Sequence, residues 1–217
     1  MRDMHCHILP GVDDGACTLD MSITMLEAAR DTGVTSVVCT PHARDPFFDY
    51  DTMRAAFDEL RPYAEAMGMS LTMGFEVAHA KLVELGVEEW AMRLAFEGTG
   101  EFLLELDPGC KEHSFREYER TIFVLQGLGL DVIIAHPERC WAVQNNTELV
   151  ERLARMGCKL QASADFVAGG HFGRERRSAK RIFRRGLYDY VASDAHRPEH
   201  YGYLRRALRE SSRWDRS

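Results

Sequence analysis

The first side chains that could do chemistry are two histidines separated by a single residue, His5 and His7. If this stretch is a β-strand, residues i and i+2 point to one face, so both imidazoles can reach the same metal ion. A lone pair of this kind is weak evidence, because in an apolar setting it is more often structural than metal-binding. Its meaning depends on which other side chains the fold brings to the same place.

Short apolar runs alternate along the chain with longer segments of helical periodicity. Strands are predicted over 2–6, 35–40, 70–75, 101–106, 131–135, 159–163 and 188–192. Helices are predicted over 19–32, 51–67, 81–92, 115–129, 146–157, 175–186 and 198–210. The runs 35–40 and 131–135 are apolar on both faces, as buried parallel strands are. About seven β–α units in succession predict an α/β fold, either a βα barrel or a doubly wound sheet.

Glycines support the predicted ends of the helices. A glycine follows the helical pattern and precedes the next strand at Gly33, Gly68, Gly129, Gly157 and Gly186. Glycine tolerates the positive φ that commonly ends a helix, so these positions suit αβ connections. Because no long linker, low-complexity segment or change of composition interrupts the pattern, we predict a single domain over residues 1–217.

Potential metal ligands occur at the ends of six of the seven predicted strands. They are His5, His7, His42, Glu76, Glu105, His136, Asp194 and His196. In a βα barrel the carboxyl ends of the strands converge on one face, so these side chains would meet in one site. Imidazoles and carboxylates without thiolates suit manganese, iron or zinc better than calcium or magnesium. The constellation therefore predicts a metal-dependent active site.

Composition narrows the possible partners and locations. The chain has 217 residues and a formal net charge of -7, so nothing global indicates a nucleic-acid partner. We see neither an apolar run long enough to cross a bilayer nor a signal segment, and we predict no membrane insertion. The six cysteines are scattered without a CxxC pair, which is typical of reduced thiols. We therefore predict a cytoplasmic protein.

Together, the motifs resemble those of a known superfamily. They are the opening Asp-Met-His-Cys-His-Ile-Leu-Pro-Gly-Val-Asp-Asp-Gly-Ala, then Thr-Pro-His, Phe-Glu-Val, Leu-Leu-Glu-Leu, Ala-His-Pro-Glu-Arg and Ser-Asp-Ala-His. This series resembles the polymerase and histidinol phosphatase (PHP) superfamily. More specifically, it resembles the bacterial tyrosine-protein phosphatases of capsule and exopolysaccharide operons. The resemblance covers nearly the whole chain and implies a distorted seven-stranded βα (TIM-like) PHP barrel.

The resemblance also implies a set of three divalent metal ions, for which we expect manganese, with iron or zinc as alternatives. The first ion would be held by His5, His7, Glu76 and Asp194. The second would be held by Glu76 as a bridge, Glu105 and His136. The third would be held by Asp14, His42 and His196. Asp14 is preferred to Asp13 because the family's ligand directly precedes the glycine.

Two arginines are candidates for binding the substrate phosphate. Arg139 belongs to the His-Pro-Glu-Arg motif, and the resemblance implies that it contacts the phosphate. Arg197 directly follows His196, whereas the close family usually has an arginine several residues after this histidine, followed by proline. Because Pro198 follows Arg197 here, as though a loop were deleted, we keep Arg197 as the second candidate.

The function implied is hydrolysis of phosphotyrosine on a protein, with the tail of a bacterial tyrosine kinase of polysaccharide export as the expected partner. A hydroxide activated by the metals would attack phosphorus, and Arg139 would stabilise charge on the equatorial oxygens. Two alternatives stay open. One is a small-molecule phosphate monoesterase resembling histidinol phosphatase, and the other is a non-catalytic regulator that keeps the barrel.

Three further features have two interpretations each. Cys110 and Arg116 fit the Cys-x5-Arg spacing of cysteine-dependent phosphatases, but the five residues between them lack the glycines that such phosphate-binding loops use. The basic run 174–185 is either a solvated amphipathic helix with Ile182 and Phe183 inward, or a docking surface for an acidic or multiply phosphorylated tail. The aromatic segment 45–50 either packs against a phosphotyrosine ring or caps the barrel.

Several side chains lie off the predicted ligand pattern. Arg44 comes two residues after His42, so it either lines the mouth of the pocket or forms a surface salt bridge. The remaining histidines are expected at the surface or beside the ligands, and they are His79, His113, His171 and His200.

Overall fold

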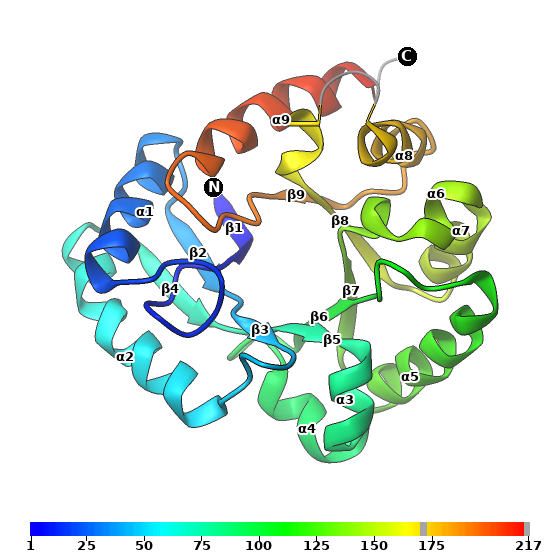
Figure 1. The fold of residues 1–217 in the computed structure, drawn as a ribbon, viewed down its shortest axis with the longest axis horizontal. Helices are drawn as coiled ribbons and strands as arrows, with labels where there is room; N and C mark the ends of the chain where they lie inside the picture. The colour runs from blue at the N-terminus through cyan, green and yellow to red at the C-terminus, as the bar shows by residue number, and fades with distance from the viewer. Residues whose placement is uncertain (170–172, 215–217) are drawn as a thin grey trace.

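The computed structural model describes residues 1–169 and 173–214, in which a ring of strands is surrounded by helices (Figure 1). The strands are β1 (Arg2–Cys6), β2 (Ser36–Cys39), β3 (His42–Ala43), β4 (Ser70–Met73), β5 (Glu76–Ala78), β6 (Glu101–Glu105), β7 (Asp131–Ala135), β8 (Lys159–Ser163) and β9 (Tyr190–Ala192). The α-helices are α1 (Leu19–Asp31), α2 (Tyr50–Ala66), α3 (His79–Leu85), α4 (Val87–Leu94), α5 (Phe115–Gly127), α6 (Trp141–Asn145), α7 (Glu148–Arg155), α8 (Arg174–Phe183) and α9 (His200–Trp214). Three short 3-10 helices are η1 (Glu112–Ser114), η2 (Pro137–Arg139) and η3 (Ala164–Val167).

The strands pair in parallel within two sheets. One sheet has the order β1-β2-β4 and the other has the order β3-β5-β6-β7-β8-β9. An isolated parallel bridge between Cys6 and Ala195 connects the end of β1 to the segment after β9. The backbone N–H of Asp194 donates to the carbonyl of His5 at 2.9 Å, and that of His7 donates to Ala195 at 2.9 Å. These contacts bring β1 next to the segment after β9, so the ring of strands closes between its first and last members.

The predicted mixed α/β fold is confirmed, but a single sheet of seven strands is not. The predicted strand 35–40 contains β2, and the predicted strand 70–75 contains β4. The short strands β3 and β5, which were not predicted, each follow after two further residues. Pro41, between β2 and β3, has no N–H to donate to a ladder. Between β4 and β5, a Cβ on Gly74 would lie 2.3 Å from the Phe96 ring, so the chain approaches its neighbour closely here.

Two predicted helices are also divided. The segment predicted as 81–92 forms α3 and α4, because Gly86 between them has a φ of 94°, which no helix accommodates. The segment predicted as 146–157 contains only α7, and the short α6 before it was not predicted. The Asn146 side chain accepts the N–H of Glu148 at 3.1 Å and so caps the start of α7.

Other expectations are confirmed. The five helix-ending glycines all have positive φ, between 64° and 93°. In β7, Ile133 and Ile134 point to opposite faces and both are fully buried. No helix in the described ranges is both long and apolar enough to cross a membrane.

Candidate metal centre

The nine predicted metal ligands converge at the carboxyl ends of the strands. His5 lies within β1, and His7 and Asp14 lie in the loop that follows it. Of the others, His42 begins β3, Glu76 begins β5 and Glu105 ends β6, whereas His136 follows β7, and Asp194 and His196 follow β9. The parallel order of the strands causes this convergence, because all the carboxyl ends point to one face.

Within this cluster, four overlapping groups have potential ligand atoms within 4.8 Å of one another. The groups are His7, Asp14, His42 and His196; His5, His7 and Glu76; His5, His136 and Asp194; and His42, Glu76 and Glu105. Each of the nine predicted residues belongs to at least one group. The side chains that the resemblance assigns to the third ion, Asp14, His42 and His196, lie together in the first of these groups.

The centre of the cluster is a buried set of imidazoles and carboxylates. The Nε2 atoms of His5 and His7 are 3.2 Å apart, and each lies within 3.4 Å of carboxylate oxygens of both Glu76 and Asp194. All four residues are at most 3% exposed. Burial opposes ionisation of Glu76, but His5, His136 and other imidazoles outweigh it and hold the pKa of this carboxyl well below its usual range.

Three buried polar atoms of the cluster have no hydrogen-bond partner among the described residues: His42 Nδ1, Glu76 Oε2 and Asp194 Oδ1. His42 Nδ1 and Glu76 Oε2 lie only 2.6 Å apart, yet their orientation does not form a hydrogen bond. Leaving such an atom unsatisfied costs about 1–3 kcal/mol. Because each of these atoms belongs to a residue of a potential metal-binding group, bound divalent cations would satisfy them, and the donor set fits a metal.

Neighbouring side chains orient the imidazoles toward the centre. Gln161 Oε1 lies 3.0 Å from His5 Nδ1, and Asp13 Oδ2 lies 2.8 Å from His7 Nδ1. The ring nitrogen that is not engaged, Nε2, then faces the cluster in both histidines. Carboxylate or amide partners of this kind commonly fix the ligating tautomer of histidines that bind metals. Gln161 was not predicted as a functional residue, although a glutamine in the middle of a strand is a visible signal.

The two adjacent aspartates have different surroundings. Asp13 is engaged by the backbone N–H groups of Gly15 and His42, at 2.9 and 3.1 Å, as well as by His7. Asp14 Oδ1 instead lies 3.1 Å from His42 Nε2 and 3.3 Å from His196 Nε2. A Cβ on Gly15 would lie 2.0 Å from the His7 carbonyl oxygen, so only glycine allows this loop to fold so closely onto β1.

Two predicted ligands have unusual backbone conformations. His136 has a φ of 27° and Asp194 a φ of 49°, and they are the non-glycine residues with positive φ in the described part of the chain. Such conformations cost roughly 1–3 kcal/mol each and persist where the surrounding structure enforces them. His136 directly follows β7, and Asp194 follows β9 after one residue. These backbone conformations occur where the chain leaves the strand and the side chain enters the cluster.

Arg139 lies beside the cluster, anchored to two carboxylates. Its Nη2 donates to Asp165 at 2.8 Å, to Asp194 at 2.6 Å and to the Ser163 hydroxyl at 3.2 Å. Arg197 differs: it is exposed, and its guanidinium makes no hydrogen bond or ion pair with the described residues. The structure therefore places Arg139 beside the metal cluster, and it leaves Arg197 at the surface next to His196.

Arg44 and the aromatic segment line the mouth of the cluster. The Arg44 guanidinium lies 3.5 Å from Asp14, 2.9 Å from His42 Nε2 and 3.9 Å from Glu105, so it faces the site. Phe47 stacks on the His42 ring with centroids 6.0 Å apart and is only half-buried. Phe48 instead packs edge-on against Phe75. Phe48 therefore caps the barrel, whereas the packing of this segment against a phosphotyrosine ring stays a prediction for Phe47.

Comparison with known proteins identifies the family. The family model described as capsular polysaccharide synthesis, CpsB/CapC, matches residues 1–207. This chain belongs to the CpsB/CapC family. Tyrosine-protein phosphatase YwqE of Bacillus subtilis (strain 168) is 32% identical over 201 residues, which cover 90% of this chain and 77% of that protein. The putative tyrosine-protein phosphatase CapC of Staphylococcus aureus is 30% identical over 203 residues, with coverage of 90% and 77%.

A solved structure agrees with this family. This structure is one of those of YwqE from Bacillus subtilis and CpsB from Streptococcus pneumoniae, which are described as metal-dependent tyrosine phosphatases. It matches this chain with a TM-score of 0.82 and 29% identity, and the match covers 97% of this chain and 87% of the solved chain. An amidohydrolase from Mycoplasma synoviae, with a TM-score of 0.61 and 14% identity, shares the fold alone. The predicted family and the prediction of a metal-dependent phosphatase are confirmed.

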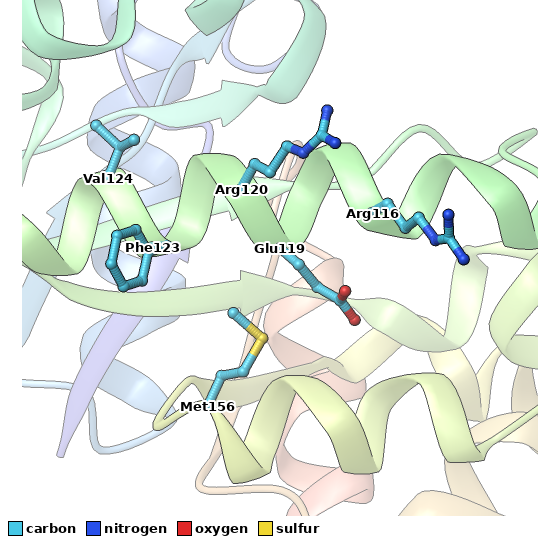
Figure 2. A pocket seen from close by; sticks show the side chains of 6 residues that line it. All are labelled: Arg116, Glu119, Arg120, Phe123, Val124 and Met156. Atoms are coloured by element: carbon cyan, nitrogen blue, oxygen red, sulfur yellow. The ribbon is translucent and has the colours of Figure 1, made fainter.

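The Cys-x5-Arg spacing of this CpsB/CapC chain does not form a phosphate-binding loop. Cys110 is buried, its Sγ lies 2.9 Å from that of Cys140, and this contact together with burial raises the pKa of its thiol. Arg116 belongs to α5 and lines a cavity of about 640 Å³ on the outside of the barrel (Figure 2). The other lining residues are Glu119, Arg120, Phe123, Val124 and Met156. None of the predicted metal ligands, and neither Arg139 nor Arg197, lines this cavity.

The histidines outside the ligand pattern have other partners. His79 Nε2 lies 2.9 Å from the Thr121 hydroxyl, and His200 Nδ1 accepts the backbone N–H of His196 at 3.2 Å. His200 therefore supports the loop of a predicted ligand. His113 lies in η1, and His171 lies outside the described residues.

Proposed function

We propose that this chain is a metal-dependent protein-tyrosine phosphatase that acts on a phosphoprotein of capsule or exopolysaccharide synthesis. The observation that carries the proposal is the cluster of nine imidazole and carboxylate residues, in which three buried atoms have no hydrogen-bond partner among the described residues. Membership of the CpsB/CapC family and the two tyrosine-phosphatase relatives support the same chemistry.

We further propose that three divalent ions bind here, manganese in preference to iron or zinc. The first would be held by His5, His7, Glu76 and Asp194, the second by Glu76, Glu105 and His136, and the third by Asp14, His42 and His196. Asp14 is assigned as the ligand, since Asp13 is already engaged in holding His7. When bound, such ions lower the pKa of water to near neutrality and stabilise the charge that develops on a phosphoryl group.

The protein's own groups would bind and orient the phosphate. Arg139 is fixed by Asp165 and Asp194, so its remaining N–H groups can donate to phosphoryl oxygens in a fixed geometry. Arg44, which directly follows β3, faces the same site and would contact the phosphate at the mouth of the cluster. Arg197 stays a second candidate, because it is exposed and directly follows His196.

Phe47 would provide the surface for the tyrosyl ring. Its ring stacks on His42, beside the metal cluster, and the Arg44 guanidinium lies 5.9 Å from the ring centroid. Aromatic pairs contribute about 0.5–1.5 kcal/mol beyond their buried area. We therefore expect Phe47→Ala to raise KM for phosphotyrosine peptides about three- to tenfold and to leave KM for an aliphatic phosphate ester unchanged. An equal change for both substrates would contradict the assignment.

We propose the tail of a bacterial tyrosine kinase as the substrate protein and the cytoplasm as the location. The six free cysteines, five of them buried, support a reducing compartment. The relatives support a protein substrate over a small metabolite, and the full set of potential ligands argues against a non-catalytic regulator.

One set of assays tests the substrate class. Purified protein loaded with manganese is assayed on a phosphotyrosine peptide, histidinol phosphate and para-nitrophenyl phosphate under identical conditions. The proposal expects kcat/KM to be highest for the peptide. A higher kcat/KM for histidinol phosphate would favour the metabolite phosphatase, and no turnover of any substrate would favour the regulator.

A further inference from the structure

The basic helix α8 contains two kinds of arginine. Some are neutralised by carboxylates: Arg176 pairs with Glu210 at 2.6 Å, and Arg185 pairs with Glu151 at 2.8 Å. The inward side of the helix is apolar as expected, because Ile182 and Phe183 are buried. These features alone describe an ordinary amphipathic surface helix.

Three other arginines of α8 line a separate cavity. Arg174, Arg177 and Arg181 follow at spacings of three and four residues, so they share one face of the helix. Together with Gln144 and Asn145 of α6, they enclose a cavity of about 210 Å³. No acidic side chain of the described residues lines it. The cavity is therefore polar and bears a concentration of positive charge.

Two of these guanidinium groups, those of Arg174 and Arg181, make no ion pair with a carboxylate of the described residues. Arg174 is exposed and makes no hydrogen bond or ion pair with the described residues. Arg181 is positioned by neutral acceptors, the Gln144 carbonyl at 2.6 Å and the Thr147 hydroxyl at 3.4 Å. Guanidinium groups that line a polar cavity without a carboxylate partner are suited to binding an anion.

This cavity is connected to the proposed phosphate site through one short segment. The Gln144 side chain donates to the backbone carbonyls of Glu138 and Arg139, at 2.9 and 3.4 Å. Helix α8 also packs against η2, which contains Arg139. Figure 1 shows α6 and α8 adjacent at the rim of the ring. A polypeptide bound at Arg139 could therefore continue along α6 toward the arginines.

We propose that Arg174 and Arg181, in this cavity, bind a second phosphoryl group on the same phosphoprotein substrate. A phosphoryl group carries nearly two negative charges and three acceptor oxygens, which match several guanidinium forks better than a single carboxylate does. The inference rests on the proposed phosphoprotein phosphatase function. The proposed site would make the enzyme select substrates that carry two phosphoryl groups close together. Its arginines are separate from the groups that hydrolyse the ester.

Peptides with one or two phosphotyrosines, synthesised at a series of spacings, test this site. We expect wild-type KM to be about tenfold lower for the best doubly phosphorylated peptide than for its singly phosphorylated counterpart, since charge-assisted contacts of this kind contribute strongly. Arg174→Ala should abolish most of this advantage without changing KM for the singly phosphorylated peptide. The matched control is Arg184→Ala, an exposed arginine of the same region outside the cavity, and it should preserve the advantage.

Several outcomes would overturn the site. One is an equal effect of Arg174→Ala on both peptides, and another is no effect on either. A peptide with glutamate in place of the second phosphotyrosine should lack the advantage; if it matches the phosphorylated peptide, the site reads carboxylate charge instead. If Arg174→Ala weakens binding to phosphatidylserine vesicles and leaves both peptides unaffected, the ligand is a lipid headgroup.

Binding separates this inference from the proposed function. Fluorescence anisotropy with labelled peptides measures the same advantage as a difference in Kd, without requiring turnover. If the wild type hydrolyses no phosphotyrosine peptide, the proposed function fails, whereas loss of the advantage in Kd on Arg174→Ala would still support the cavity. If hydrolysis proceeds and Kd is the same for both peptides, only the cavity assignment fails.

Discussion

The two ends of the strand ring carry similar residue types in different arrangements. At the amino ends, Glu101 of β6 pairs with Arg2 at 2.7 Å, and Asp131 of β7 pairs with Lys159 at 3.5 Å. At the carboxyl ends, imidazoles and carboxylates gather in one buried cluster with unsatisfied lone pairs. The charges at the amino ends thus form separate pairs, whereas those at the carboxyl ends share one cluster, in which some buried atoms have no hydrogen-bond partner among the described residues. We infer that charged residues at strand ends indicate a metal site where they converge and leave such atoms unsatisfied.

Strand β6 allows this comparison within five residues, because Glu101 begins it and Glu105 ends it. We expect Glu105→Gln to reduce kcat/KM by about 10²–10³-fold and to lower the metal content, because the carboxylate would be an ion's ligand. The same substitution at Glu101 removes a partly exposed ion pair, which is worth about 1 kcal/mol or less, and should leave activity unchanged. Steady-state kinetics and elemental analysis of both variants check this. Equal losses at the two positions would contradict the difference between the two ends.

A smaller effect is expected from the aspartate that holds His7. Asp13→Ala removes the acceptor for His7 Nδ1, and loss of such a partner typically costs 10–100-fold in metal affinity or activity. Asp13→Asn keeps an acceptor oxygen and should lose less. Asp131→Ala, at the other end of the ring, is the control and should behave as the wild type. Manganese titrations of the three variants measure the effect; an unchanged affinity in Asp13→Ala would show that His7 needs no orienting partner.

Proton competition should weaken metal binding as the pH falls. Burial lowers the pKa of His5, but Glu76 and Asp194 outweigh it and raise this pKa to about 8. Below pH 8 a metal ion must therefore displace a proton from the imidazole, whereas above it the lone pair is free. We expect manganese affinity to fall about tenfold or more per unit between pH 8 and pH 7 and to level off above this range. Calorimetric titration at several pH values measures it, and an affinity that rises with acidity would contradict the prediction.

The smallest expected effect concerns Cys110. Its thiol is buried against Cys140 and lies outside the metal cluster, so Cys110→Ser should keep kcat within about twofold of the wild type. Thermal stability should fall slightly, because a hydroxyl replaces a thiol in an apolar setting. A loss of activity as large as that expected for Glu105→Gln would revive the Cys-x5-Arg hypothesis.

The convergence of the ligands could be predicted because it depends on local rules. The period of two in a strand predicts that the side chains of His5 and His7 point to the same face. The alternation of strands and helices predicts that Glu105 and His136 lie at the same end of a parallel sheet. The helix-ending glycines, such as Gly33, follow from backbone sterics alone.

What could not be predicted depends on contacts between distant segments. The break between β4 and β5 coincides with the close approach of Gly74 to Phe96. The carboxylate partners of Arg139, Asp165 and Asp194, lie 26 and 55 residues away in sequence, so no spacing rule reveals them. Gln161 was visible as a polar residue in a buried strand, but its role needed the position of His5.

The central claim is that the cluster at the carboxyl ends acts through bound metal ions. The most direct test is to remove metals with a chelator, verify the removal by elemental analysis, and measure hydrolysis of a phosphotyrosine peptide before and after manganese is restored. The account predicts that activity falls to background without metal and returns with manganese. Full activity in protein shown to be free of metal would contradict it.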